Sequence, residues 1–339
     1  MSMKRIVCLG EVLLRLGAPG HEPLLRSPRF ETSIGGAEAN VAIALANLGL
    51  DTALVSTLPA NPLGDACLGE LRRHGVDTSG IARSPGRLGL YFLTHGAMLR
   101  ASTVVYDRDG SAFAEATPSR YDWSRLLEGA AWLHVTGITL ALGPRCEQAV
   151  AAAVQTAVAN GVQVSFDCNF RPSLWAGRES DARRLLAATA RQADLVFANS
   201  ADGEFIFGLD TKAQPGAERL RALAAGLSAE CPRLHWLAGT NRVVHGTGHH
   251  ELSGFLVDRG SVVESDTLAL DGIVDRIGAG DAYAAGVLYG LSQAMAPQPC
   301  VAFATTLAAL KHSVPGDFSG LQVEEVRAAM GPRARDVRR

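Results

Sequence analysis

Residues 275–286 read Asp-Arg-Ile-Gly-Ala-Gly-Asp-Ala-Tyr-Ala-Ala-Gly, a glycine-rich turn that runs directly into a helical pattern. Glycines allow successive backbone N–H groups to converge on an anion, and the positive end of the following helix strengthens such binding. Asp281 stands near the start of that helix, where a carboxylate can take a proton from an attacking hydroxyl. The stretch indicates either a phosphate-binding turn with an adjacent base or an ordinary turn followed by an N-cap aspartate.

The rest of the chain alternates short apolar runs with longer Ala- and Leu-rich helical patterns. This alternation is typical of βαβ units on a parallel sheet, so we predict an α/β fold with a doubly wound, mostly parallel sheet. The expected strands are residues 5–9, 52–57, 132–136, 163–167, 195–198 and 234–237. The expected helices are residues 37–48, 62–74, 144–159, 181–190, 216–227 and 281–293.

Two segments interrupt this rhythm with alternating apolar and polar residues and with Gly/Pro punctuation. They are residues 13–34 and 86–114, and we read both as antiparallel strands that pair into one small β-sheet lid. The remaining segments, residues 1–12, 35–85 and 115–330, would form the main α/β domain. The basic tail, residues 331–339, is expected to be frayed.

Composition limits the classes of partner. The chain has 339 residues, 47% hydrophobic content and a net charge of -2, which rules out disorder as the main state and gives no field that attracts nucleic acid or a membrane. We expect a small molecule or another protein as partner, and a homo-oligomer stays open. Six dispersed cysteines and the lack of an apolar leader or a membrane-length span predict a cytoplasmic protein.

Several phosphate-handling and hydrolytic motifs are excluded. The sequence has no Gly-Lys pair, as a Walker A loop requires, and no G-x-S-x-G elbow. A dehydrogenase is disfavoured because Tyr283 stands where a dinucleotide fingerprint needs its third glycine. His245, His249 and His250 lie around a Gly-Thr-Gly hairpin without a complete ligand set, so we expect a solvated loop there.

A second glycine motif, residues 34–40, reads Ile-Gly-Gly-Ala-Glu-Ala-Asn and opens the first strong helix. A small ligand could approach the backbone at Gly35 and Gly36, with the Asn40 amide reaching the ligand hydroxyls. The alternative is a tightly packed turn between a strand and a helix.

Together, the two glycine motifs resemble those of the PfkB, or ribokinase-like, family of carbohydrate kinases. That family combines an N-terminal G-G-x-x-x-N motif, here residues 35–40, with a C-terminal D-x-x-G-A-G-D motif, here residues 275–281. The resemblance implies that Asp281 is the catalytic base and that Gly278, Ala279 and Gly280 form an anion hole. It also implies ATP with Mg²⁺ as the phosphoryl donor, and Gly35-Gly36 as a hinge for lid closure.

Within this family the chain is most similar to 2-keto-3-deoxygluconate kinases. The stretches that carry this similarity are residues 10–16, 89–91, 106–108, 137–139, 167–171 and 311–317. The resemblance implies that Gly35, Tyr91, Tyr106, Arg108 and Arg171 contact a keto-acid sugar, whose carboxylate an arginine can hold. From the residues alone, Arg108 could lie in a solvated turn, Arg171 could pair with Asp167, and both tyrosines could be packing residues.

The nucleotide segments depart from the family pattern. Arg276 and Ile277 replace two threonines, which puts a monovalent-cation site in doubt, and Leu237 and Arg242 replace the ends of a K-x-G-x-x-G segment. The implied nucleotide contacts are Asn199, Asp202, Gly239, Gly278 and Gly280. We assign no direct metal ligand, although Asp202 could organise Mg²⁺ through water. A kinase for fructose or ribose and a catalytically silent sugar-binding regulator stay open as alternatives.

Overall fold

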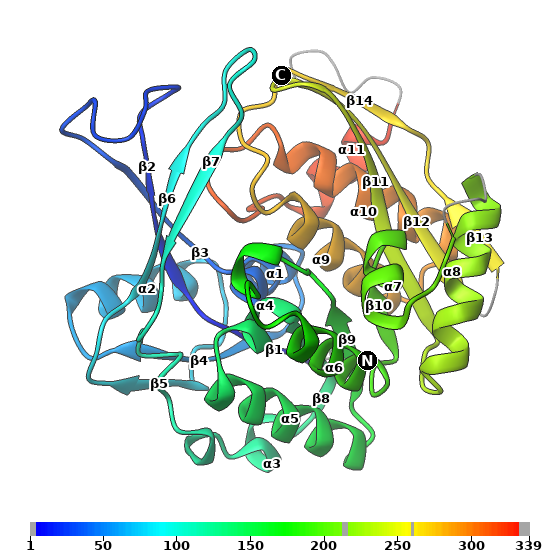
Figure 1. Ribbon diagram of the computed structural model, residues 1–339, viewed down its shortest axis with the longest axis horizontal. Helices are drawn as coiled ribbons and strands as arrows, with labels where there is room; N and C mark the ends of the chain where they lie inside the picture. Colours follow the sequence, from blue (N-terminus) through cyan, green and yellow to red (C-terminus); the bar gives the residue numbers. More distant parts are fainter. Residues whose placement is uncertain (1–4, 212–215, 259–260, 332–339) are drawn as a thin grey trace.

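A ten-stranded sheet forms the centre of the protein, in the order β13-β12-β11-β10-β9-β8-β1-β4-β5, with β14 paired to β12 (Figure 1). The computed structural model describes residues 5–211, 216–258 and 261–331. The run from β5 to β11 is parallel, and β12, β13 and β14 are antiparallel additions at one edge. The strands are β1 (Arg5–Leu9), β4 (Thr52–Pro59), β5 (Ile81–Ser84), β8 (Ala130–Thr136), β9 (Gln163–Asp167), β10 (Leu195–Phe197), β11 (Trp236–Gly246), β12 (His249–Asp258), β13 (Ser261–Glu264) and β14 (Leu268–Asp271).

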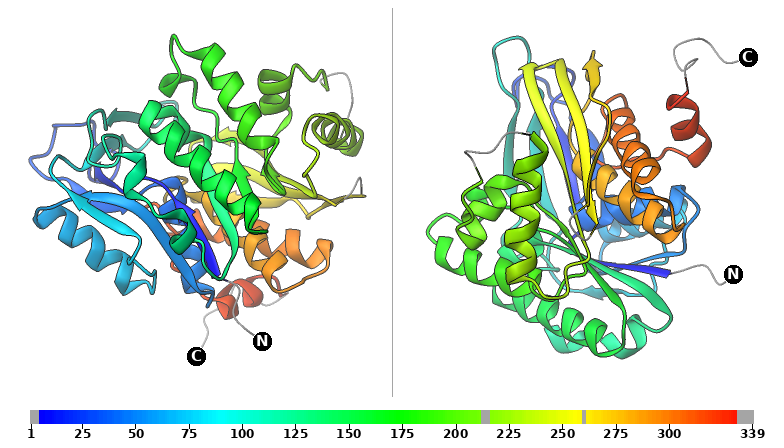
Figure 2. Two further views of the ribbon diagram at one scale, coloured as in Figure 1. Left: turned by 90° about the horizontal axis from the view of Figure 1, so that it is seen from below. Right: turned by 90° about the vertical axis from the view of Figure 1, so that its right-hand side faces the viewer.

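The helices lie in two layers, one on each face of this sheet (Figures 1 and 2). Alternate strand residues supply two cores: Val7 and Leu9 of β1 belong to one, Ile6 and Cys8 to the other. The first core is covered by α3 (Trp123–Leu126), α5 (Pro144–Ala159), α6 (Glu179–Ala190), α7 (Ser200–Phe207) and α8 (Gly216–Glu230), with α4 (Gly137–Ala141) beside α5. The second is covered by α1 (Ala37–Asn47), α2 (Pro62–Arg73), α9 (Ala279–Ser292), α10 (Pro297–Lys311) and α11 (Val323–Ala329). The predicted doubly wound α/β fold is confirmed.

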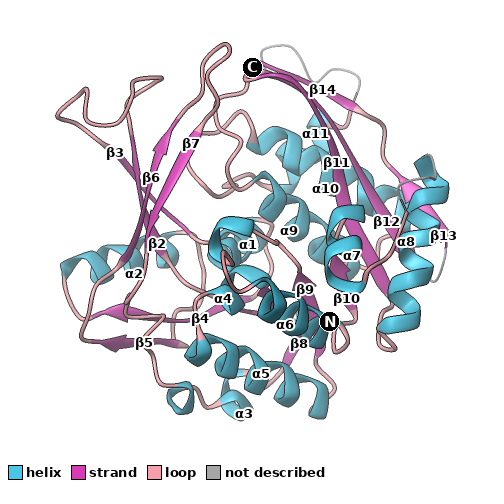
Figure 3. Cartoon of the chain, viewed as in Figure 1, coloured by secondary structure: helices cyan, strands magenta, loops and turns pink. Residues whose placement is uncertain are grey.

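A second, four-stranded sheet projects from the edge of the main body (Figures 1 and 3). Its order is β3-β2-β6-β7, formed by β2 (Leu13–Gly17), β3 (Glu31–Gly35), β6 (Gly89–Thr94) and β7 (Thr103–Asp107). We call it the small sheet. The pairs β2–β3 and β6–β7 are antiparallel as predicted, but β2 and β6 pair in parallel. Both strands leave the main body outward, β2 after β1 and β6 after β5, so they run in the same direction.

The bounds predicted for the central strands and helices agree well with the structure. The strands at the antiparallel edge of the large sheet were predicted poorly. Strands β1 and β9 and helix α5 have the predicted bounds, whereas α9 begins at Ala279, two residues early. Strand β11 extends to Gly246 and pairs with β12 as a long hairpin, although most of its second half is exposed. Pairing rather than burial holds this extension, so its composition gave no strand signal. Helix α10 was missed because it has no charged residue before Lys311, and its threonines, Thr305 buried and Thr306 half-buried, bond back to the preceding turn.

The carboxyl ends of the parallel strands meet at the edge of the large sheet that faces the small sheet. Glu11 follows β1, Asp167 ends β9 and Asn199 follows β10. The strand order reverses between β1 and β8, and open α/β sheets bind ligands at such a point. Every helix in the described part of the chain is too short or too polar to cross a bilayer. The tail expected to fray falls, from residue 332 on, outside the described residues.

Candidate active site

A cavity of about 730 Å³ opens between the carboxyl edge of the large sheet and the small sheet. Gly35 is the one predicted site residue that does not line it. Those that do line it come from segments far apart in the chain: Gly36, Asn40, Tyr91, Tyr106, Arg108, Arg171, Asn199, Asp202, Gly239, Gly278, Ala279, Gly280 and Asp281. Gly35 ends β3, and a side chain there would collide with the carboxylate of Asp317.

The glycine turn begins α9 in the way that an anion site requires. Gly278 is the N-cap residue, with φ 78°, and a Cβ atom there would lie 1.5 Å from the carbonyl oxygen of Asp317. At Gly280, by contrast, a Cβ would meet no atom within 4 Å. The N–H groups of Gly280 and Asp281 lie in the first turn of the helix, where helix geometry provides no acceptor. They are free to bind an anion in the open space beside them.

Asp281 is half-buried at the foot of α9 and is held by Asn40 of α1. The Asn40 Nδ2 group donates to Asp281 Oδ2 at 2.7 Å, while Asn40 Oδ1 is buried without a partner among the described residues. Burial raises the pKa of Asp281 to about 7, although the Asn40 hydrogen bond and the charge of Arg171 act in the opposite direction. Near neutral pH this carboxyl can therefore take up and release a proton, as a general base must.

Asp167 and Asp202 are two of the further carboxyl groups that line the same cavity. Burial, together with the charges of Asp281 and Asp202, raises the pKa of Asp167 to about 8. Burial also raises the pKa of Asp202, which forms a capping box with Asn199 at the start of α7. The Asn199 side chain accepts from the Asp202 N–H at 3.1 Å, and the Asn199 N–H donates to Asp202 Oδ2 at 2.9 Å. These two predicted nucleotide contacts thus also have a structural task.

The described residues hold no group of three or more His, Cys, Asp or Glu side chains that could bind a metal ion alone. Mg²⁺ bound together with a nucleotide keeps several waters and takes only one or two protein carboxylates beside substrate phosphates. Asp167, Asp202 and Asp281 offer such carboxylates at the cavity.

Three arginines give the cavity a positive side. Arg171 follows β9, Arg242 lies on β11 and Arg276 lies in the glycine turn. Burial lowers the pKa of Arg242, and the charges of Arg276 and Arg171 lower it further. None of the three has an ion-pair partner among the described carboxylates, so the suggested Arg171–Asp167 pair does not form. The charge of Arg171 opposes burial, which raises the pKa of Asp167, Asp202 and Asp281, but Arg171 forms an ion pair with none of them. Three like charges close together favour binding of an anion.

Tyr91 and Tyr106 of the small sheet and Arg108, which follows β7, have different environments. Arg108 is buried and donates from Nε to Glu11 Oε2 at 2.8 Å, which excludes the solvated turn. Glu11 Oε1 is buried without a partner among the described residues. Tyr106 is 39% exposed at the cavity, whereas Tyr91 is buried and its hydroxyl donates to Asp317. Arg108 is therefore ion-paired with Glu11, whereas Arg171 has no ion-pair partner among the described carboxylates.

Close packing leaves no room for a side chain at two further glycines that were predicted as site residues. At Gly36, with φ 137°, a Cβ would lie 2.1 Å from the Glu11 carbonyl oxygen. At Gly239, a Cβ would lie 2.7 Å from the ring of Phe255. Both glycines allow close approach of neighbouring segments, in addition to lining the cavity.

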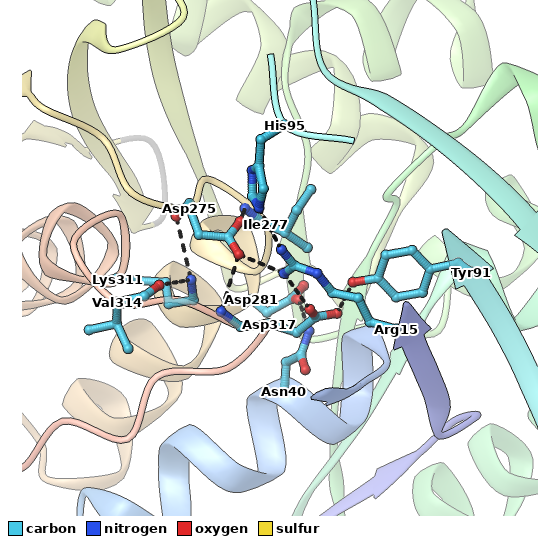
Figure 4. A network of polar contacts seen from close by, with 11 residues as sticks. Arg15, Asn40, Tyr91, His95, Asp275, Ile277, Asp281, Lys311, Val314 and Asp317 are labelled. Carbon is cyan, nitrogen blue, oxygen red and sulfur yellow. Dashed lines mark hydrogen bonds and ion pairs between the residues drawn. The ribbon is translucent and has the colours of Figure 1, made fainter. Parts of the chain in front are cut away.

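Sequence reasoning missed a buried charged network behind the glycine turn (Figure 4). Arg15 of β2 donates to Asp275 and Asp317, and the Lys311 ammonium lies against the backbone of the same turn. Arg15 stands between two leucines in a short strand, and Lys311 ends an apolar helix. An isolated charge in an apolar segment was the one signal that could have indicated this network.

Substitution by alanine should affect the stability of the protein differently at Gly278 and at Gly280. We expect Gly278→Ala to lower the free energy of unfolding by at least about 2 kcal/mol, because it combines a left-handed conformation with a backbone collision. Gly280→Ala should change it by less than about 0.5 kcal/mol, because the space there is open. Urea unfolding of both variants checks this, and equal losses would show that the turn does not pack as described.

Comparison with known proteins finds relatives and solved structures that are similar to this chain over most of its length. Residues 3–323 match the pfkB family carbohydrate kinases. The chain is 31% identical over 325 residues to a 2-dehydro-3-deoxygalactonokinase of Haloferax volcanii, with 96% of each chain covered. It is 30% identical to a 2-dehydro-3-deoxygluconokinase of Bacillus subtilis, covering 98% of this chain and 96% of the relative. The crystal structure of a 2-dehydro-3-deoxygluconokinase from Thermotoga maritima, 36% identical, superimposes with a TM-score of 0.92 over 96% of this chain and 99% of that one. The chain belongs to the PfkB family of carbohydrate kinases.

Proposed function

We propose that this kinase transfers a phosphoryl group from ATP to 2-dehydro-3-deoxy-D-gluconate and forms its 6-phosphate. The observation that carries this proposal is the position of Asp281, a carboxyl with a pKa of about 7 beside the open helix N-terminus at Gly280. An unpaired arginine, Arg171, faces the same cavity. The cavity thus combines a base, a phosphate site and a carboxylate site.

Asp281 acts as the base that orients and deprotonates the terminal hydroxyl of the sugar acid. The amide of Asn40, at 2.7 Å, fixes the carboxylate so that one oxygen is left for the substrate. Asn40 Oδ1, buried and unpartnered among the described residues, is available to accept from another hydroxyl of the sugar. Positioning of this kind is the main contribution of a protein to phosphoryl transfer.

The phosphates of ATP are assigned to the glycine turn and to the positive side of the cavity. The N–H groups at the start of α9 point at the anion, and Arg242 and Arg276 offset its charge. Bound Mg²⁺ would neutralise part of the charge on the transferred phosphoryl group. Asp202 and Asp167 are the carboxylates placed to hold its water shell.

The acidic substrate is supported by Arg171. Because Arg108 is already paired with Glu11, Arg171 is the predicted substrate residue whose charge is free for a carboxylate. The relatives named 2-dehydro-3-deoxygluconokinase and 2-dehydro-3-deoxygalactonokinase agree with an acidic, keto-deoxy sugar. They differ in the configuration of that sugar, so both acids belong in the test.

The direct test is a coupled ADP-release screen over 2-dehydro-3-deoxygluconate, 2-dehydro-3-deoxygalactonate, fructose and ribose. We expect the highest kcat/KM with the gluconate acid. A preference for fructose or ribose would replace the proposal with a neutral-sugar kinase. Sugar binding without ADP release from any of the four would indicate the silent regulator.

The base assignment predicts a pH dependence. A base must be ionised, so kcat/KM should rise about tenfold per pH unit up to about pH 7 and then level. Asp281→Asn removes the proton acceptor but keeps the size, and it should lower kcat by about 10²–10⁴-fold while sugar affinity is largely retained. The measurements are a pH–rate profile and binding of the sugar to the folded variant.

The matched control is Asp167→Asn, which removes another carboxyl of raised pKa from the same cavity. This variant should keep the rise toward pH 7, whatever its absolute rate. If the rise disappears in Asp167→Asn, or if Asp281→Asn turns over within a few-fold of the parent, Asp281 is not the base.

The carboxylate assignment predicts a loss that depends on the substrate. A charge-assisted hydrogen bond contributes about 1.5–3 kcal/mol, so Arg171→Ala should lower kcat/KM for the gluconate acid by roughly 10- to 150-fold. Weak activity on fructose or ribose should change much less, because neutral sugars carry no carboxylate. Arg171→Lys should restore only part of the loss.

Arg184→Ala serves as the charge-matched control for this comparison, because Arg184 lies exposed on α6 and pairs with Asp181. It should leave both kinds of substrate unaffected. Equal proportional losses on acid and neutral sugars in Arg171→Ala would show that Arg171 serves the nucleotide or the fold instead.

A further inference from the structure

Arg15 joins the small sheet to the main body through two buried ion pairs (Figure 4). It is the middle residue of β2 and is 5% exposed. Its Nη1 group donates to Asp275 Oδ2 at 2.6 Å and to Asp317 Oδ1 at 3.0 Å, across 260 and 302 residues of sequence. Its other terminal nitrogen lies 3.0 Å from His95 Nε2. The guanidinium thus binds two carboxylates that belong to different segments of the main body.

Asp275 holds the glycine turn together. Its Oδ1 accepts from the Ile277 N–H at 3.0 Å, and its Oδ2 accepts from the Gly316 N–H at 3.1 Å. The same carboxylate therefore fixes both the start of the turn and the loop against which Gly278 packs. Anything that anchors this carboxylate also anchors the N–H groups that follow at the start of α9.

The network is balanced in charge only while Arg15 is present. Lys311, at the end of α10, is fully buried and donates to the carbonyl oxygens of Val314 at 3.0 Å and Asp275 at 3.5 Å. The cationic side chains of Arg15 and Lys311 thus lie close to the carboxylates of Asp275 and Asp317. These two aspartates are 2% and 3% exposed. If Arg15 left, two buried carboxylates would share one cation, which is unfavourable at low dielectric. Burial already raises the pKa of Asp317.

A second residue of the small sheet contacts the same site. Tyr91 of β6 is the register partner of Arg15 in the parallel β2–β6 pair, so both side chains leave the same face. The Tyr91 hydroxyl donates to the Asp317 carboxylate. Of these two contacts, Arg15 alone also reaches Asp275. Ile277 of the turn packs against apolar side chains of the small sheet, so Arg15 adds a charged link beside this apolar contact.

We propose that Arg15 is a positioning residue that couples closure of the small sheet over the sugar to the order of the phosphate-binding turn. When the sheet is closed, Arg15 completes the network behind Asp275 and holds the turn in its binding conformation. Sugar held under the sheet and nucleotide held at the turn therefore strengthen each other's binding, as linkage requires. This inference rests on the proposed function for the identity of the two ligands.

The test measures that coupling directly. The affinity of a non-hydrolysable ATP analogue with Mg²⁺ is determined by calorimetry without sugar and with saturating 2-dehydro-3-deoxygluconate. We expect the sugar to tighten analogue binding at least about fivefold in the parent protein. Arg15→Met, similar in length but uncharged, should reduce this factor to within about twofold of unity, while binding of the analogue alone stays within a few-fold of the parent. Full coupling in the folded Arg15→Met variant would overturn the proposal.

Two further variants keep the test decisive. Arg15→Lys keeps the charge but loses the fork that reaches both carboxylates, so its coupling factor should be about threefold or more below that of the parent; a parental factor would overturn the proposal even if Arg15→Met does not fold. Arg87→Met is the matched control, because Arg87 lies just before β6 and makes a solvent-exposed ion pair with Asp107 of β7, and its coupling should equal the parent's. If the parent does not phosphorylate the gluconate acid, the proposed function fails by itself, and the coupling is measured with the sugar that is phosphorylated.

Discussion

The contact between Gly278 and the main chain of Asp317 determines the geometry of the active site. No side chain fits between them, since a Cβ on Gly278 would lie 1.5 Å from the Asp317 carbonyl oxygen. The left-handed conformation of Gly278 then sets the direction in which α9 begins. From this start, the free N–H groups of the first turn open to the cavity, and Asp281 comes within 2.7 Å of Asn40 on a different helix. The close approach of the Gly278 and Asp317 backbones thus positions both the phosphate site and the base.

The charged groups around the cavity are unfavourably placed in the empty protein, and a ligand that offers opposite charges would stabilise them. Carboxyl groups of raised pKa, at Asp167, Asp202 and Asp281, lie near three arginines without ion-pair partners among the described residues. Burial and mutual repulsion are unfavourable for both sets in the free protein. A polyphosphate that carries a divalent cation offers the opposite charge to each. Strongly perturbed groups of this kind are typical of functional sites.

The local parts of this site could be predicted from the sequence. Both glycine motifs and the helices that they open carry signals within a dozen residues, and the structure places Gly280, Asp281 and Asn40 in one cavity. The long-range pairs could not be predicted. Arg108 meets Glu11 across 97 residues and Arg15 meets Asp317 across 302, and a single sequence does not record which distant charges come together. Strand β12 was missed as well, and the solvated loop expected around its first residues was wrong: His249 and His250 lie in the strand, paired with β11, and His250 is buried.

The departures from the family's nucleotide motifs have a consistent place in the structure. Arg242 and Arg276, which replace smaller or differently charged residues of the family pattern, lie near each other on the wall of the cavity beside the glycine turn. The altered segments thus add positive charge where the triphosphate is proposed to bind.

A crystal structure with a non-hydrolysable ATP analogue, Mg²⁺ and 2-dehydro-3-deoxygluconate tests most directly whether one backbone turn places both the phosphate and the base. We expect the terminal phosphate to accept from the N–H of Gly280, the 6-hydroxyl to lie within hydrogen-bond distance of Asp281, and the carboxylate of the sugar acid to meet Arg171. A terminal phosphate bound away from the start of α9, or a sugar whose carboxylate rather than its hydroxyl faces the glycine turn, would contradict this arrangement.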